Sequence, residues 1–223
     1  YNVADYLPIN DGDSYTLENA LDVNDVLTLS TSYELNVPNL MADAYTLYRR
    51  GVTNDSLLGY VNAPFGGGVT GHGWASDADF GSQTVYDVPG TLLPATLEYN
   101  VPHTASFVGA SYSPIGGTVV DATDDAVSVT LIAYGAATTP LGTFNDTITL
   151  SIQWTSMTLG GGVSTSRSVD LTLAWGVGVV SFYDYNTFQT YNLTSGTVYG
   201  YPVAADVPAG GGGTPTTYNV MDY

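Results

Sequence analysis

Residues 147–175 constrain the fold of this chain more than any other stretch. Apolar side chains occupy every second position from Ile148 to Trp154, and polar side chains lie between them. The same alternation returns from Val169 to Trp175. A period of two places the apolar residues on one face of an extended strand. We therefore predict two long strands that bury one face in a core and expose the other.

Three consecutive glycines, Gly160–Gly162, separate the two runs. Glycine adopts the positive φ angles of tight turns at little cost, so we expect the two strands to form a hairpin. The apolar face of this hairpin should pack on a second sheet. Trp154 and Trp175 belong to that face by phase, and both are predicted to be buried.

The alternation changes phase near the end of the first run, because Met157 and Leu159 occupy the positions that polar residues held before. A β-bulge adds one residue to a strand and reverses the facing of the residues after it. We therefore predict a bulge near Thr155 and Ser156 that returns the two apolar side chains to the core.

The rest of the chain predicts an all-β protein, because short alternating segments recur and convincing helical periodicity is absent. We expect a jelly-roll-like antiparallel β-sandwich or barrel formed by residues 1–61 and 118–213. Residues 62–117 are rich in glycine and proline, which predicts a small inserted β subdomain with long loops. Four glycines, at 210–213, would tether residues 214–223 as a C-terminal arm.

The charge balance is extreme. The chain has 21 acidic residues, three arginines and no lysine, and its formal net charge is −18. Such a charge makes a compact chain repel itself in dilute buffer, whereas molar salt shortens the screening length to about 3 Å. This composition favours a protein that works in brine, with an acidic calcium-binding extracellular protein as the alternative. Three arginines are too few to neutralise a phosphate backbone, so we expect no nucleic-acid partner.

The sequence contains no recognisable catalytic motif. It has no cysteine, no nucleotide-binding glycine loop and no Gly-x-Ser-x-Gly element. The two histidines, His72 and His103, are too few to hold a zinc ion without carboxylate ligands. No apolar run approaches the ~20 residues of a membrane-spanning helix. We therefore predict a protein that is not an enzyme and has no transmembrane segment.

Calcium is the one ligand for which the sequence offers clustered oxygen donors. The candidate metal residues lie in two turn-like segments and are Asp11, Asp13, Asp121, Asp124 and Asp125. The alternative interpretation is that these carboxylates are solvated turn residues that cap backbone amides. Tyrosine is abundant, and Tyr183, Tyr185 and Tyr191 could form a sugar-binding or protein-binding surface.

The two ends of the chain carry nearly the same hexapeptide. Residues 1–6 read YNVADY and residues 218–223 read YNVMDY, so five of six positions match. We predict that both ends dock in similar grooves or pair as strands during assembly. The predicted assembly residues are the tyrosines and valines that the two hexapeptides share: Tyr1, Val3, Tyr6, Tyr218, Val220 and Tyr223.

In acidity, lysine avoidance, size and β content, the chain resembles the single jelly-roll capsid proteins of membrane-containing icosahedral viruses of halophilic archaea. Some of those proteins carry a small second β domain on the capsid-forming one, which is what residues 62–117 would be. The resemblance implies a self-assembling virion coat subunit whose partners are copies of itself and a second coat protein. It rests on composition and layout, with no shared motif.

Two other functions fit the sequence. The first is a secreted filament or pilus subunit, at the cell surface or outside the cell, in which a terminal strand completes the sheet of the next subunit. The first residue, Tyr1, favours this alternative, because virion coats need no signal peptide. The second is a carbohydrate-binding module stabilised by calcium.

Overall fold

The computed structural model describes residues 1–51, 56–63, 67–76, 81–160, 162 and 164–208, and almost all regular structure in them is β. One short helix, α1 (Val3–Tyr6), precedes the strands in this part of the chain. The strands are β1 (Ser14–Asn19), β2 (Val26–Glu34), β3 (Ala44–Arg50), β4 (Ser56–Asn62), β5 (Val69–Ser76), β6 (Ser82–Leu93), β7 (Pro102–Ser113), β8 (Thr118–Thr139), β9 (Gly142–Thr158), β10 (Ser164–Ala174), β11 (Gly178–Asp184), β12 (Gln189–Val198), β13 (Tyr201–Pro202) and β14 (Val207–Pro208).

The strands close into a 12-stranded antiparallel barrel. Each strand from β1 to β12 pairs with the next one along the chain, and β1 pairs with β12. The short strands β13 and β14 extend β12 and β9. The all-β prediction is confirmed, and of the two predicted architectures the structure has the barrel. A jelly roll requires long connections between non-adjacent strands, whereas here every strand follows its neighbour.

The predicted hairpin is confirmed as β9 and β10. Leu150 lies opposite Leu171, and the pairing runs without interruption along the whole of β10. Ile148, Leu150 and Leu173 are completely buried. Trp154 and Trp175 are half-buried rather than fully buried, although both pack against the main core as their phase predicts.

The predicted bulge near Thr155 and Ser156 is wrong. The β9–β10 register shows no shift, so the period of two continues to the end of β9. Ser156 is consequently buried, while Met157 and Leu159 are 44% and 57% exposed on the outer face. Two exposed apolar side chains cost less than a broken ladder of backbone hydrogen bonds.

The segment predicted as an inserted subdomain supplies three consecutive strands of the barrel wall, β5, β6 and β7. Val69, Tyr86 and Phe107 belong to the main core, so the described part of 62–117 is not a separate unit. Its glycines allow close strand packing: a Cβ at Gly73 would meet the carbonyl oxygen of Thr84. Glycine in a strand often marks such close backbone approach.

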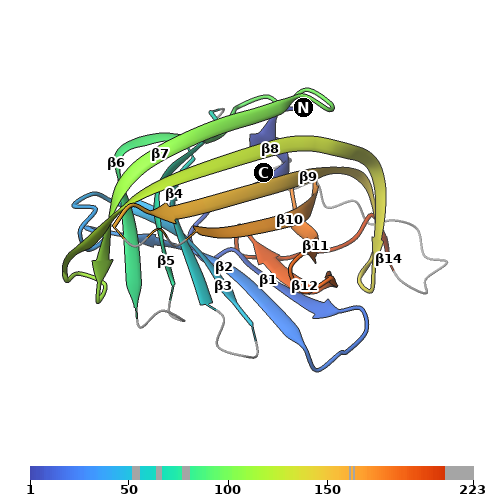
Figure 1. The fold of residues 1–223 in the computed structure, drawn as a ribbon. Helices are drawn as coiled ribbons and strands as arrows, with labels where there is room; N and C mark the ends of the chain where they lie inside the picture. The colour runs from blue at the N-terminus through green and yellow to red at the C-terminus, as the bar shows by residue number, and fades with distance from the viewer. Residues whose placement is uncertain (52–55, 64–66, 77–80, 161, 163, 209–223) are drawn as a thin grey trace.

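The barrel is flattened, with strands crossing at a steep angle. In Figure 1, β8, β9 and β10 run across the molecule, whereas β4, β5 and β6 run steeply down it. One hydrophobic cluster fills the interior and draws on residues from all around the wall, including Leu17, Leu131, Leu150 and Leu193. A smaller outer cluster forms where Val37 packs with Ala44, Tyr60 and Ala75. This arrangement resembles orthogonal sheet packing.

No helix in the described residues is long and apolar enough to span a membrane.

Candidate functional site

The two ends of the barrel interior differ in polarity. Residues 1–6 cover one end, where Val3 and Tyr6 join the main core. Inward-facing side chains there are apolar, as at Phe144 and Ile148. At the other end, where the β1–β2, β9–β10 and β11–β12 turns lie, inward-facing side chains are polar or aromatic. We call this second region the polar end.

Strand periodicity places the side chains of the polar end. Asp125 lies on the same face of β8 as the buried Val127 and Val129, so its carboxylate points inward. Trp154 follows Leu150 on the inner face of β9. Arg167 pairs directly with Trp154 and therefore shares that face.

Asp125 is the centre of a first group of residues, the Asp125 cluster, at 0% exposure. Its Oδ2 atom accepts hydrogen bonds from the indole of Trp74 and the hydroxyl of Tyr86, each of 2.9 Å. Trp74 packs edge-on against Trp154, with ring centroids 4.9 Å apart. Tyr86 stacks on Phe107 with centroids 4.5 Å apart. Aromatic rings thus surround a buried carboxylate.

Two buried oxygens of this cluster find no hydrogen-bond partner among the described residues: Oδ1 of Asp125 and the hydroxyl of Thr123. A buried acceptor without a donor costs free energy, so it marks a place that a water or ligand donor would satisfy. Burial and the neighbouring Asp125 raise the pKa of Tyr86 far above its usual value of 10, so its hydroxyl keeps its proton and remains a donor.

A second group of inward-facing residues surrounds Arg49 and is called the Arg49 cluster. The guanidinium of Arg49 lies 5.4 Å from the ring centroid of Phe182, a cation–π geometry. The hydroxyl of Tyr191 is 2.8 Å from Asp25 Oδ2 and 2.9 Å from Gln189 Oε1. Most of these side chains keep partial solvent exposure although they face the interior.

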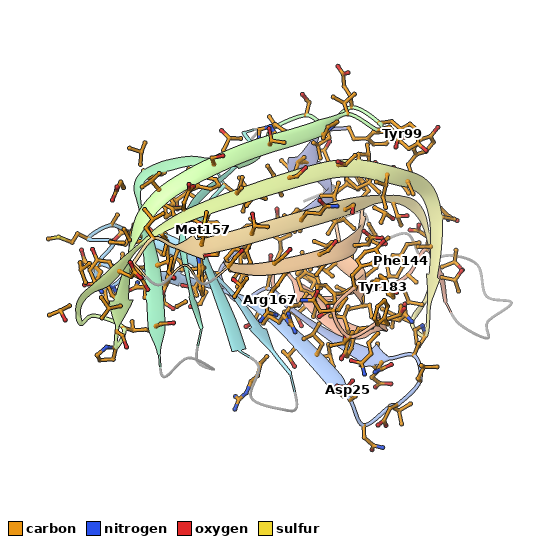
Figure 2. All side chains as sticks on the ribbon, in the orientation of Figure 1. Asp25, Tyr99, Phe144, Met157, Arg167 and Tyr183 are labelled. Carbon is orange, nitrogen blue, oxygen red and sulfur yellow. The ribbon has the colours of Figure 1, made fainter. Side chains whose placement is uncertain are left out.

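The two clusters are joined along β10. Arg167 lies opposite Trp154 on one side, and Val169 lies opposite the buried Asp184 of β11 on the other. In the view of Figure 2, Arg167 lies just below β10, with Asp25 farther down at the β1–β2 turn. Two of the three arginines of the chain therefore face the polar end, despite the net charge of −18.

The pKa of Tyr191 shows how burial and charge act within the Arg49 cluster. This pKa is raised to about 12, first by burial and then by the hydrogen bond and charge of Asp25, while Arg49 acts in the opposite direction. The hydroxyl is therefore protonated at neutral pH. The polar end consequently carries protonated hydroxyls, guanidinium groups and carboxylates at inward-facing positions of its strands.

In the first predicted calcium group, the carboxylate oxygens accept hydrogen bonds from other groups of the protein. Asp13 is completely buried, and its two oxygens accept hydrogen bonds from the backbone of Asn10, the side chain of Asn10 and the backbone of Tyr199. Asp11 is exposed and caps the amide of Tyr33. These contacts match the alternative interpretation of turn-capping carboxylates.

The second predicted calcium group is divided by the pleat of β8. Asp125 points inward and is buried, whereas Asp124 is exposed on the outer face. Asp121 accepts hydrogen bonds from the amides of Ala122 and Gly160. Among the described residues, no three carboxylate or histidine side chains gather where they could hold a metal ion.

The predicted assembly residues have different surroundings. Val3 and Tyr6 are 1% and 5% exposed and pack into the core of their own subunit, so their role in contacts between subunits stays a prediction. Tyr1 is 43% exposed and packs on Tyr134. The residues of the second hexapeptide, Tyr218, Val220 and Tyr223, lie outside the described residues.

The predicted tyrosine surface is divided between two faces. Tyr183 and Tyr185 form an edge-on pair, and Tyr185 donates a hydrogen bond to Asp170. Tyr191 lies opposite Phe182 on the inner face, so it belongs to the polar end instead.

Sequence reasoning missed the polar end, although its signal was present. Arg167 occupies the same phase as Val169, Leu171 and Leu173, and Asp125 the same phase as Val127. A charged residue at an inward position of an alternating strand indicates either a paired core polar group or a site. The partnership of Trp74 with Asp125 joins residues 51 positions apart and had no local signal.

Comparisons with known proteins add little to this picture. No family model and no curated protein matches the chain. One solved structure, described as a "putative lipoprotein" from Parabacteroides distasonis ATCC 8503, is similar over 88% of this chain and 97% of that one. The two are 15% identical, and the TM-score is 0.39.

Proposed function

We propose that this protein is a non-enzymatic binding protein that holds a small sugar at the polar end of its barrel. The observation that carries the proposal is Oδ1 of Asp125, a buried carboxylate oxygen without a hydrogen-bond donor among the described residues. A sugar hydroxyl is a suitable donor, and hydrogen bonds to charged groups contribute about 1.5–3 kcal/mol.

The surroundings of Asp125 support a sugar over other polar ligands. A sugar ring has an apolar face and a rim of hydroxyls, so its sites combine aromatic rings with planar polar groups. Trp74 and Trp154 are half-buried beside Asp125, which leaves ring surface available for packing. Arg167 and the Arg49 cluster supply further donors and acceptors along the same wall.

Titration of the protein with mono- and disaccharides in molar salt tests the proposal, with tryptophan fluorescence and calorimetry as readouts. We expect saturable binding that Asp125→Asn weakens about 10- to 100-fold, the equivalent of losing one charged hydrogen bond. Asp124→Asn is the matched control, because it makes the same chemical change one residue away on the outer face.

Thermal melts of both variants verify that each remains folded. A protein that binds none of the sugars would refute the proposal. Equal losses of affinity in the two variants would place the binding surface elsewhere.

The assembly functions remain predictions. A virion coat subunit, assembling with its own copies and a second coat protein, is predicted from composition and layout, and a secreted filament subunit is predicted from the terminal segments and Tyr1. Strand complementation requires an acceptor edge. The strands β1 to β12 form a closed ring of pairings, within which β6 and β7 pair over only four residues each. The absence of enzymatic activity is likewise a prediction.

A further inference from the structure

The first six residues bind the barrel as a docked peptide. Residues 1–3 pair antiparallel with residues 95–97 through two backbone hydrogen bonds of 2.9 and 3.0 Å, which place Asn2 opposite Thr96. The hydrogen bonds are made by the residues on either side of this pair. Asn2 and Thr96 are therefore a non-hydrogen-bonded pair, the closer of the two antiparallel spacings.

Side chains fix the docked peptide at three further points. Val3 and Tyr6 enter the main core, and the Tyr6 hydroxyl donates a 2.8 Å hydrogen bond to Asp146. Asn2 caps α1 and also donates to the side chain of Asp5. We call the surface that receives residues 1–6 the docking site.

The second hexapeptide preserves every position that makes these contacts. Residues 218–223 differ from residues 1–6 at one place, where Met221 replaces Ala4. Ala4 is exposed, whereas the equivalents of Asn2, Val3, Asp5 and Tyr6 are unchanged. The single difference thus falls where the docked side chain points to solvent.

The described chain passes close to the docking site at Asp206, shortly before its end at Pro208 opposite Gly142. The backbone amide of Asn145 donates a 2.7 Å hydrogen bond to Asp206, and Asn145 is adjacent to Asp146, the partner of Tyr6. Strand β14 then pairs with β9 at Thr143. Residues 209–217 connect this point to the second hexapeptide and can span about 30 Å when extended.

We propose that residues 218–223 are a second ligand of the docking site and exchange with residues 1–6 in the same chain. A segment that is linked to its binding site by a few residues has an effective concentration in the millimolar range. The same chain is therefore favoured over a second copy at ordinary protein concentrations. The docking site lies at the end of the barrel opposite the proposed sugar site, so each proposal can fail alone.

A disulfide trap tests the exchange, and a chain without cysteine gives it a clean background. A non-hydrogen-bonded antiparallel pair is close enough for a disulfide. Thr96→Cys with Asn219→Cys should therefore cross-link within one chain when residues 218–223 are docked. Val3→Asp should raise the yield several-fold, because a buried charge expels the competing segment. The matched control is Val23→Cys with Asn219→Cys, since Val23 is exposed in the β1–β2 turn.

Non-reducing gels and mass spectrometry distinguish the outcomes. An intramolecular product from the Thr96 pair, with little from the Val23 pair, supports the proposal. Circular dichroism shows whether the Val3→Asp variant folds. If it does not fold, the same two cysteine pairs are compared in a chain that keeps Val3. The proposal would be overturned by any of three results. These are no cross-linked product in the chain that keeps Val3, equal yields from the two cysteine pairs, or a product that joins two chains.

Discussion

At the scale of single residues, the distinctive feature is the number of buried carboxylates. Asp13, Asp125 and Asp184 are all at most 5% exposed. Both oxygens of Asp13 accept hydrogen bonds, one from Asn10 in its own turn and one from the distant Tyr199, whereas Asp125 keeps one oxygen without a donor in the described structure. Burying a carboxylate costs free energy unless its oxygens are paired. Asp125, with one unpaired oxygen, is therefore a better guide to function than Asp13.

The burial of His72 can be tested through the pH dependence of protein stability. His72 is 9% exposed, and burial lowers its pKa below the usual 6.5. The unfolded chain therefore binds a proton more readily than the folded one, and stability should fall as the pH drops below about 6.5. We expect His72→Gln to flatten the dependence of the melting temperature on pH between about 7 and 5.5. His103→Gln is the control, and equal slopes in both variants would contradict the prediction.

At the scale of secondary-structure elements, the β9–β10 hairpin shows which structural features a local sequence pattern determines. The alternation sets the faces of both strands, and the register joins Leu150 to Leu171 and Ile152 to Val169. The apparent phase change at Met157 does not alter the path of the strand. Backbone pairing with two neighbours, β8 and β10, is stronger than the preference of one side chain for the interior.

Two alanine substitutions in β9 test this assignment of faces. Leu150→Ala removes a completely buried side chain and should lower the free energy of unfolding by about 2–5 kcal/mol. Met157→Ala removes an outer side chain that is 44% exposed and should change it by about 0.5 kcal/mol or less. Denaturant unfolding measures both. A large loss for Met157→Ala would indicate that this side chain is buried in solution.

At the scale of the whole molecule, the net charge destabilises the compact state, whereas closure of the barrel stabilises it. A net charge of −18 opposes compaction, and the closed barrel counters it with one continuous core. Closure also leaves the described wall without a full-length free edge, which protects a β-protein from edge-to-edge aggregation.

Salt should therefore stabilise the molecule through screening. We expect the melting temperature to rise steadily from low to molar sodium chloride. Calcium chloride at matched ionic strength should give the same increase, because the candidate aspartates do not converge in the described structure. Melting curves in both salts check this. An unchanged melting temperature would refute the brine interpretation, and an added effect of calcium would indicate a specific site.

Features that depend on neighbouring residues could be predicted from the amino-acid sequence alone. The strand faces of the hairpin, the inward phase of Trp154 and the all-β class follow from a period of two, which is local. The charge of the molecule follows from composition alone, and so does the predicted dependence of its stability on salt.

Which strands are neighbours, and which side chains meet inside the barrel, depends on the fold as a whole. Nothing local distinguishes a jelly roll from successive pairing, because both use the same alternating strands. The contact of Asp125 with Trp74, and the docking of residues 1–6 on residues 95–97, join distant parts of the chain. Such contacts depend on how the whole barrel closes, so the polar end and the docking site emerge only in the folded molecule.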